Sequence, residues 1–363
     1  MTLTDPSTPT ELSGPTEAAA PFERSTIAPP SPEVYAQAIT YCDSLAMPTR
    51  ALFGLTELGC WVAAAQGKLP PDPLDNVRVV VFAGDHGIAA DGVSAYPTSV
   101  TAGVSAEVLS GGSGVAVLAR HNGVHLRLAD MAVDADLDVP AEAVAYKIRR
   151  GSGNIRVEDA ITREEAERAL AAGAAIAAEE IAAGAQLLIA GDVGIGNTTP
   201  SAALIAATYG VPAIEVTGPG TGLDAEGVRR KAACIDEAIA RCGDRLADPV
   251  ERLACLGGAD LAAATGYMIA AARAGVPVLI DGVIAAAEAT MAEAIAPGAK
   301  AWMRAGHRSP EPGLTFAMEQ FGLAPILDLG MRLGEGTGAI CAVPLLRSGI
   351  ALVREMATLS DVI

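Results

Sequence analysis

A run of β-branched and aromatic residues, Val77–Ala83, constrains the fold of this chain more than any other stretch. Every residue in it except Arg78 is apolar. Apolar residues on both faces are typical of a strand that helices cover on both sides, so the run predicts a buried strand of a parallel sheet. Gly84–Gly87 follows it and carries an Asp and a His. Open α/β sheets bind their ligands at this carboxyl end of their strands.

Further short apolar runs alternate with helical segments, and most of them end in Gly, Asp or polar residues. The predicted strands after the first are Val124–Met131, Gln186–Ala190, Ala213–Thr217, Val276–Ile280 and Ala324–Leu329. This order predicts an α/β fold, a doubly wound and mainly parallel sheet flanked by helices. One predicted helix, Arg163–Gly184, carries five glutamates that we expect on a solvated face: Glu164, Glu165, Glu167, Glu179 and Glu180.

The two ends of the chain differ from this pattern. Residues 1–32 are rich in Pro, Ser, Thr and Glu, which predicts a disordered extension. Residues 33–70 carry apolar residues mostly at three- and four-residue steps and are expected to form a helical cap. A C-terminal helix at 344–361 is expected to return to this cap and complete a small helical subdomain. Residues 71–343 then form a Rossmann-like catalytic domain.

Composition excludes several classes of partner. The net charge of −18 disfavours nucleic acid and anionic membranes. The six cysteines form no C-x-x-C pair and have no His nearby, so we expect free thiols in a reducing compartment and no metal site. The N-terminus lacks a basic and an apolar signal region, and apolar stretches such as Leu261–Ala272 are shorter than a membrane span. A cytoplasmic protein without a membrane partner is the expectation.

The stretch Met331–Ala339 lies between the apolar runs Ala324–Leu329 and Ala339–Leu346, and this order predicts a Gly-rich turn that joins a strand to a helix. It places Glu335 between Gly334 and Gly336, with Gly338 two residues further on. Glycines allow positive φ and a close approach of the backbone to a ligand. A carboxylate in such a turn, among apolar residues, is a candidate general base with a raised pKa. The alternative is an exposed glutamate in a surface loop.

Two other Gly-rich turns predict anion binding. The first, Gly191–Pro200, precedes a helix and offers backbone N–H groups and hydroxyls, although it lacks the Lys of a Walker motif. Its candidates are Gly194, Gly196, Asn197, Thr198 and Thr199. The second, Gly218–Asp224, offers Gly220 and Thr221 and precedes a helix with a basic triplet that ends at Lys231. One cation of the triplet can lie over a phosphate. The alternatives are a structural turn and a solvated helix face.

Several other polar residues stand at predicted strand ends or in loops. Asp85 and His86 end the first strand, with a turn Asp and a satisfied His as the alternative. The loop Asp91–Thr101 contains Tyr96 and Thr98 and is a candidate for ligand contacts. The remaining candidates are Asp281, His307 and Ser309.

Six blocks of this sequence, in order, resemble the nicotinate-nucleotide–dimethylbenzimidazole phosphoribosyltransferase family of cobalamin lower-ligand biosynthesis. They are Phe82–Tyr96, Gly194–Thr199, Thr217–Asp224, Asp281-Gly282, Gly306–Gly313 and Met331–Ala339. The resemblance extends over roughly Ala36 to Leu359, and six ordered blocks make it specific.

The resemblance implies a reaction and roles for several residues. Phosphoribose passes from nicotinate mononucleotide to 5,6-dimethylbenzimidazole with inversion, which gives α-ribazole 5′-phosphate and nicotinate. Glu335 matches the proposed base, and Lys231 matches a lysine that contacts phosphate. The turn Gly194–Thr199 would hold the phosphoribosyl part. The resemblance further implies a homodimer, and neither a cofactor nor a metal is expected.

The acceptor base would lie near a set of residues at the sheet edge, namely Asp85, His86, Tyr96, Thr98, Leu333 and Gly334. The chain departs from the family at two points. Many members have Glu-Met where this chain has Asp192-Val193, so Asp192 is a second catalytic candidate, one methylene shorter. Many members also have Gln after the loop proline, where this chain has Thr98, which bears on the choice of base.

Two other classes of function are alternatives for this chain. A nucleotide-dependent dehydrogenase needs G-x-G-x-x-G directly after the first strand, and Gly84–Gly87 does not fit that pattern. A non-catalytic nucleotide-binding protein is the other alternative. The presence of Glu335 argues against it, because a decayed relative is free to lose its base.

Overall fold

The computed structural model describes residues 22–363, and within them six strands form one parallel sheet. The order is β2-β1-β3-β4-β5-β6, so the chain reverses its direction across the sheet between β1 and β3. The strands are β1 (Val77–Gly84), β2 (Val124–Ala132), β3 (Leu187–Val193), β4 (Val278–Ile280), β5 (Met303–His307) and β6 (Pro325–Leu327). The predicted α/β class with a doubly wound parallel sheet is confirmed.

Helices cover both faces of the sheet. In β1, Val79 and Val81 pack into one apolar cluster with α2, α4 and α14, whereas Val80 and Phe82 pack into another with α6, α11 and α12. The larger helices are α2 (Phe53–Gln66), α3 (Ser99–Ser110), α4 (Gly114–Asn122), α6 (Arg163–Ala182), α7 (Thr198–Tyr209), α9 (Ala225–Cys242), α10 (Pro249–Leu256), α11 (Ala259–Arg273), α12 (Val283–Ile295), α13 (Pro312–Phe321) and α14 (Thr337–Glu355). Burial on both faces explains why β1 reads as a continuous apolar run.

The Ala-rich helices α6 and α11 approach each other closely. A Cβ on Gly173 would lie 1.7 Å from the carbonyl oxygen of Ala263, and one on Gly266 would lie 2.0 Å from that of Leu170. Both glycines are therefore required for this contact, and small side chains elsewhere let the two helices form one dense layer over the sheet.

Two predicted elements are corrected by the structure. Ala213–Thr217 is not a strand, because Ala213–Val216 forms a short helix, α8. Both edges of β3 are already occupied by β1 and β4, so this segment finds no free edge there. Met303–His307 forms β5, a strand that was not predicted from the sequence, so the block Gly306–Gly313 begins inside a strand.

The predicted solvated face of α6 is wrong for Glu180. This residue is buried, and its carboxylate pairs with Arg78 of β1 and, at 3.0 Å, with Nη1 of Arg127 of β2. Helical periodicity alone does not place Glu180 on the side of α6 that faces the sheet. That placement depends on Arg78 and Arg127, which reach Glu180 from the strands.

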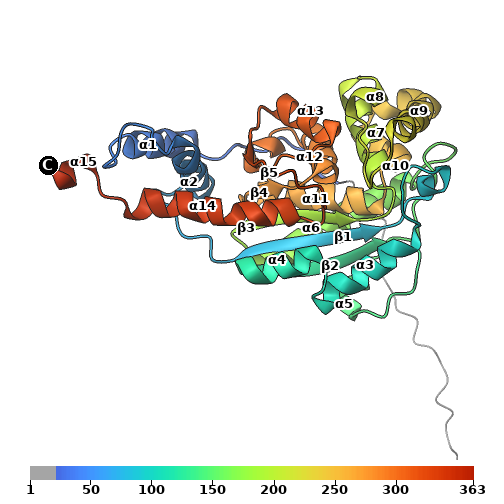
Figure 1. Ribbon diagram of the computed structural model, residues 1–363, viewed down its shortest axis with the longest axis horizontal. Helices are drawn as coiled ribbons and strands as arrows, with labels where there is room; N and C mark the ends of the chain where they lie inside the picture. The colour runs from blue at the N-terminus through green and yellow to red at the C-terminus, as the bar shows by residue number, and fades with distance from the viewer. Residues whose placement is uncertain (1–21) are drawn as a thin grey trace, which may run out of the picture.

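The helices at the two ends of the chain form an arm beyond the sheet (Figure 1). It comprises α1 (Pro32–Cys42), α2, the end of α14 and α15 (Leu359–Val362). A separate apolar cluster joins Ala38, Cys60 and Val353 there. Ile27 is buried and donates its N–H to the carbonyl of Pro297, so ordered chain begins before the predicted boundary at 33. Residues 1–21 of the predicted extension lie outside the described residues.

Two helical stretches in the described residues are long and apolar enough to cross a membrane, by length and composition alone, whereas none was expected. They are Ser99–Asn122, which is broken between α3 and α4, and Thr337–Glu355, which is α14. More than half of the α14 window is buried in the protein, as expected of a central helix packed on a sheet.

Candidate functional site

A cavity of about 420 Å³ opens at the carboxyl edge of the sheet, near the point where the strand order reverses. Its walls come from the ends of β3 and β5, the starts of α7 and α12, and the segment before α14. The lining residues are Tyr96, Asp192, Asn197, Thr198, Gly220, Thr221, Gly282, Val283, Ile284, His307, Ser309, Glu311, Arg332, Leu333 and Gly334. This is where doubly wound sheets place their ligands.

The structure brings ten of the predicted site residues to this wall. They are Tyr96, Asp192, Asn197, Thr198, Gly220, Thr221, His307, Ser309, Leu333 and Gly334. Glu335 follows Gly334 directly and lies beside the wall. The others lie behind the lining residues or outside the set that forms the wall: Asp85, His86, Thr98, Gly194, Gly196, Thr199, Lys231 and Asp281.

Glu335 has an unusual backbone conformation. Its φ is 61°, and Gly334 and Gly336 on either side have φ of 87° and 88°. A side chain in the left-handed region costs about 1–2 kcal/mol, and such strain is typical of functional sites. The turn is fixed in part by Thr337, whose hydroxyl donates to the carbonyl of Gly334 at 2.7 Å. The sequence predicted a turn here but not that the carboxylate itself occupies the strained position.

The Glu335 carboxyl is buried, and this raises its pKa. The negative charge of Asp281 acts in the same direction, while the backbone N–H of Val115 opposes both. Its Oε2 has no hydrogen-bond partner among residues 22–363. A carboxylate with one unpaired oxygen and a raised pKa is suited to accept a proton.

Asp192 lies in β3 rather than in the turn after it, so the strand is longer than predicted. Asn197 donates to its Oδ1 at 2.7 Å, while its Oδ2 has no partner in the described part of the chain. Burial raises the pKa of Asp192 well above its usual value. The carboxylate of Asp260 adds to this rise, and Asn197 and His86 oppose it.

The turn after β3 leads directly into α7, which begins at Thr198, three residues before the predicted start. A Cβ on Gly194 would lie 2.1 Å from the carbonyl oxygen of Gly84, so only glycine allows β1 and β3 to end side by side. Asn197 is the N-cap but makes no side-chain cap, since its amide is bonded to Asp192. Thr199 donates its N–H to the carbonyl of Gly196 at 3.0 Å, and Pro200 has no N–H. Among the first three residues of α7, the N–H of Thr198 is thus the one without a partner in the described chain and is available to an anion.

Lys231 of α9 is fully buried, which overturns the solvated-face alternative for this member of the triplet. Its Nζ donates to the Thr198 hydroxyl at 2.6 Å and to the carbonyl of Gly218 at 3.4 Å. Burial lowers the pKa of Lys231 to about 8, and the charge of Glu311 opposes this. The cation therefore lies directly beneath the cavity wall and acts on it through Thr198.

The turn Gly218–Asp224 joins the cavity to the loop that carries Tyr96. The Thr221 hydroxyl accepts from the N–H of Ala95 at 2.8 Å, and the N–H of Gly220 donates to Oε1 of Glu311 at 2.8 Å. Tyr96 itself is exposed at the cavity mouth. Thr221 thus fixes the turn relative to the Tyr96 loop, and Glu311 fixes it relative to the segment that follows β5.

Asp85 and His86 support the sheet edge instead of lining the cavity. Asp85 Oδ2 accepts from the N–H of Asp134 at 2.8 Å, and His86 Nε2 lies 2.9 Å from Oδ2 of Asp260. Burial lowers the pKa of His86, but the carboxylates around it, chiefly that of Asp260, raise it on balance. Oδ1 of Asp85 has no partner among residues 22–363, and neither residue lines the cavity, so their contact with a base stays a prediction.

Four residues at or under the site were not predicted from the sequence: Asp260, Glu288, Glu311 and Arg332. Glu288 is the only acid in the first ten residues of α12 and is fully buried; burial and nearby acids, Asp192 first, raise its pKa well above normal. A lone acid in an Ala-rich buried helix was a usable signal. Arg332 is the one arginine or lysine among the lining residues, and the motif around Glu335 already contained it.

One group of potential metal ligands occurs among the described residues, namely Asp159, Cys242 and Cys255. None of them lines the cavity. Both oxygens of Asp159 accept from guanidinium groups of Arg241 and Arg245, so the carboxylate is already satisfied.

Comparison with known proteins points to one family. A family model described as Phosphoribosyltransferase matches residues 27–362. The nicotinate-nucleotide–dimethylbenzimidazole phosphoribosyltransferase of Mycolicibacterium paratuberculosis is 51% identical over 94% of this chain and 97% of its own length. That of Mycobacterium tuberculosis is 49% identical over 92% of both chains. The crystal structure of CobT from Thermus thermophilus superposes with a TM-score of 0.87 at 43% identity, over 91% of this chain and 98% of that one.

Proposed function

Because the chain belongs to this phosphoribosyltransferase family, we propose that its cavity transfers 5-phosphoribose from nicotinate mononucleotide to 5,6-dimethylbenzimidazole. The enzyme is a pentosyltransferase of cobalamin biosynthesis. The observation that carries the proposal is Glu335, a buried carboxylate with a raised pKa in a strained turn beside the cavity.

The reaction requires the protein to position the two substrates and to supply one general base. The bond from ribose C1′ to the nicotinate nitrogen breaks, and the electron pair neutralises the pyridinium. A benzimidazole nitrogen forms the new bond to C1′, and the proton on that ring passes to the Glu335 carboxylate. A departing pyridinium needs no acid catalyst, so alignment of the two rings and removal of one proton supply the rate enhancement.

The remaining roles follow from position on the wall. The N–H and hydroxyl of Thr198 at the start of α7, with Lys231 behind them, form the phosphate site. Gly220 and Thr221 border the same side. Tyr96 and Leu333 are exposed apolar groups at the mouth and suit a flat aromatic acceptor. Asp192 faces the space between and stabilises positive charge on the ribose when it is ionised.

A product assay tests this function. The purified protein is incubated with nicotinate mononucleotide and 5,6-dimethylbenzimidazole, and nicotinate and α-ribazole 5′-phosphate are quantified together. Equal amounts of both products support the transfer. Nicotinate without ribazole phosphate would identify a hydrolase instead. Turnover with adenine or a phenol but not with the benzimidazole would leave the proposed mechanism unchanged. The acceptor would then be a different base, and the Thr98 loop would be the segment that selects it.

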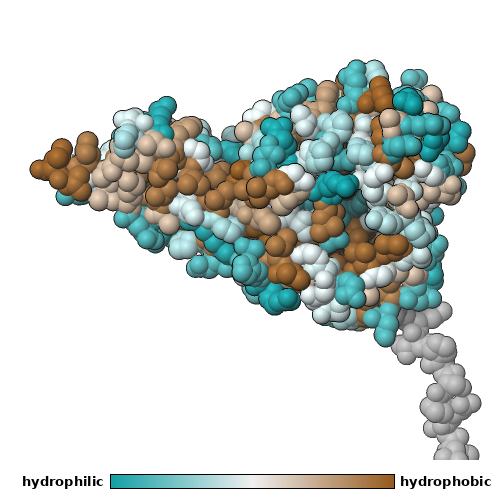
Figure 2. Space-filling model, in the orientation of Figure 1, coloured by the Kyte–Doolittle hydropathy of each residue, from teal (hydrophilic) through white to brown (hydrophobic). Residues whose placement is uncertain are grey.

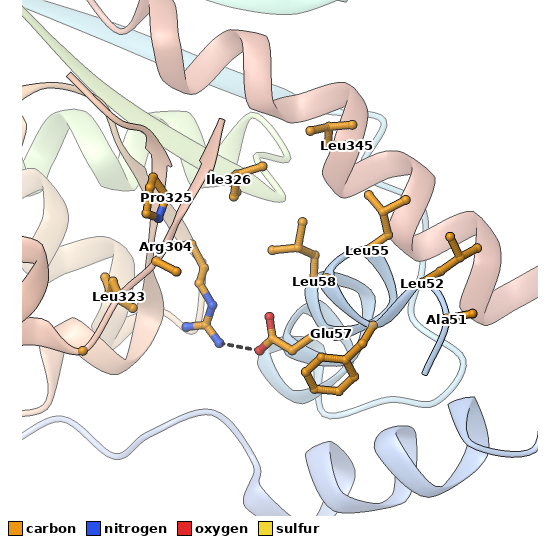
Figure 3. Close-up of a pocket in the computed structure, with 14 residues that line it drawn as sticks. Ala51, Leu52, Leu55, Glu57, Leu58, Arg304, Leu323, Pro325, Ile326 and Leu345 are labelled. Atoms are coloured by element: carbon orange, nitrogen blue, oxygen red, sulfur yellow. Dashed lines mark hydrogen bonds and ion pairs between the residues drawn. The ribbon is translucent and has the colours of Figure 1, made fainter. Parts of the chain in front are cut away.

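A homodimer built through the helical arm, residues 33–70 with 344–361, is part of the proposal. A hollow of about 660 Å³ lies between α2 and the β5–β6 edge, where the Glu57–Arg304 ion pair spans 3.1 Å between mostly apolar residues (Figure 3). Leu52 and Phe53 at its rim are about 40% exposed, and apolar surface continues along the arm (Figure 2). An exposed apolar surface of this kind is typical of an interface.

Light scattering tests the dimer. The wild-type chain is expected at twice its 36.6 kDa mass, and Phe53→Glu is expected to shift it towards the monomer. A monomeric wild-type protein at micromolar concentration would exclude the dimer.

We also place the protein in the cytoplasm, since all six cysteines are free thiols.

A further inference from the structure

The first turn of the helix α14 is capped by a side chain that follows a strand of the sheet. Asp281 follows β4 directly and is buried. Its Oδ2 accepts from the N–H of Gly336 at 3.1 Å, and its Oδ1 accepts from the N–H of Ala339 at 2.9 Å. Gly336 is the N-cap of α14 and has no side chain with which to cap the helix itself. Asp281 therefore supplies a cap that the local sequence lacks.

Glycines on the neighbouring strands hold the same turn against the sheet. A Cβ on Gly191 of β3 would lie 2.3 Å from the carbonyl oxygen of Glu335. A Cβ on Gly306 of β5 would lie 2.7 Å from Cα of Ala339. Because β4 lies between β3 and β5, Asp281, which follows β4, lies centrally under the turn. Residues of β3 and β5, and Asp281 after β4, thus fix the backbone position from which the Glu335 side chain extends.

The charge of Asp281 has two favourable neighbours. One is the N-terminus of α14, where partial positive charge accumulates on free N–H groups. The other is His307, whose Nε2 lies 3.5 Å from Oδ1 of Asp281 while its Nδ1 lies 2.9 Å from the carbonyl of Arg308. The His307 ring also packs on Gly338, where a Cβ would lie 2.0 Å from Cδ2 of the ring. The Asp281 side chain therefore contacts the helix N-terminus and lies beside the His307 ring.

We propose that Asp281 is a positioning residue for the base: its two hydrogen bonds to Gly336 and Ala339 hold the turn that aims the Glu335 carboxylate at the acceptor. The inference rests on the proposed function. Asp281 does not line the cavity, whereas Leu333 and Gly334 on the same turn do. Its effect on catalysis therefore passes through Glu335 rather than through contact with substrate.

A double-mutant cycle separates this role from a general structural one. In Asp281→Asn one oxygen still accepts, but the amide nitrogen cannot, so one of the two bonds is lost. A misplacement of about 1 Å costs on the order of 100-fold in rate. We expect kcat to fall about 10- to 100-fold with the nucleotide KM unchanged within about 3-fold. In the Glu335→Gln background the same substitution is expected to change kcat by less than about 3-fold.

Independent losses would overturn the proposal. If Asp281→Asn and Glu335→Gln multiply in the double variant, Asp281 does not act through the base. A raised nucleotide KM with unchanged kcat would likewise assign Asp281 to binding. Asp281→Glu, which retains the charge and both acceptor oxygens, is expected to recover more activity than Asp281→Asn, and equal losses would contradict the hydrogen-bonding role.

Hydrogen exchange on the wild-type protein provides a readout that needs no turnover. The amides of Gly336 and Ala339 are expected to exchange as slowly as those in the middle of α14, although neither has a partner within the first turn of a helix. Rapid exchange at both amides would refute the cap, even if no variant folds. A wild-type protein without transferase activity would remove the proposed function, and the exchange result would still decide whether Asp281 fixes the turn.

Discussion

The ammonium nitrogen of Lys231 lies 2.6 Å from the hydroxyl oxygen of Thr198, and only the latter residue belongs to the cavity wall. The cation is thus held just beneath the start of α7. There it strengthens the positive potential at the helix N-terminus without direct exposure to solvent.

Lys231→Met removes this charge while it nearly preserves the buried volume. We expect the KM for nicotinate mononucleotide to rise about 10-fold or more, because a lost charge-assisted interaction costs roughly 1.5–3 kcal/mol. Steady-state kinetics with varied nucleotide checks this. Arg230→Met is the matched control, since Arg230 lies on the exposed side of α9, and its one ion pair among residues 22–363 is with Glu226 at 3.4 Å. Equal effects of the two substitutions would exclude a specific role for Lys231.

The lowered pKa of Lys231, about 8, predicts a pH dependence of nucleotide capture. The protonated form binds the phosphate, so kcat/KM for the nucleotide is expected to fall as pH rises through about 8 in the free enzyme. A pH profile from 6.5 to about 9.5 measures this. The same limb should be absent in Lys231→Met, and its persistence there would assign it to another group.

Backbone strain at Glu335 predicts an unusual order of stabilities. At φ 61° glycine is favoured over alanine, so Glu335→Gly is expected to be more stable than Glu335→Ala by about 0.5–1 kcal/mol. Urea denaturation measures the difference. Glu164, exposed in the first turn of α6, is the control, because there glycine should be the less stable of the two. The same order at both sites would contradict a strained Glu335.

Glu180→Gln tests the buried ion pairs between α6 and the sheet. Arg78 and Arg127 would lose a charged partner, and we expect a loss of about 2 kcal/mol, below the roughly 3–5 kcal/mol of fully buried pairs because both arginines are partly exposed. Chemical denaturation of this variant beside Glu164→Gln gives the comparison. Indistinguishable midpoints would show that Glu180 contributes no more than a surface glutamate.

The sequence predicted strands best where burial on both faces leaves a continuous β-branched run, as in Val77–Ala83. It missed β5, because Met303–His307 contains no β-branched residue and is a strand only through its partners β4 and β6. The four-residue helix at Ala213–Val216 has the composition of a strand, and only the occupied edges of β3 exclude it.

The candidate site, like the fold, could be predicted from the sequence only in part. Gly-rich turns locate the cavity, since glycine reports a backbone requirement that the sequence itself displays. Which side chains point into the cavity depends on long-range contacts. His86 is directed away by Asp260, and Lys231 is buried by the turn at Gly218–Asp224, and neither effect has a local signal. The role of Asp281 likewise depends on two N–H groups that lie more than fifty residues away.

Substitution of the base tests the account most directly. Turnover of Glu335→Gln with nicotinate mononucleotide and 5,6-dimethylbenzimidazole is compared with that of the wild type, and nucleotide affinity is measured by calorimetry as the control. We expect an unchanged Kd and a loss of about 10²- to 10⁴-fold in kcat, because general base catalysis typically contributes that much. The raised pKa of Glu335 further predicts that wild-type kcat falls with acidification, and that the variant lacks this limb. Wild-type turnover by Glu335→Gln at every pH would contradict the account.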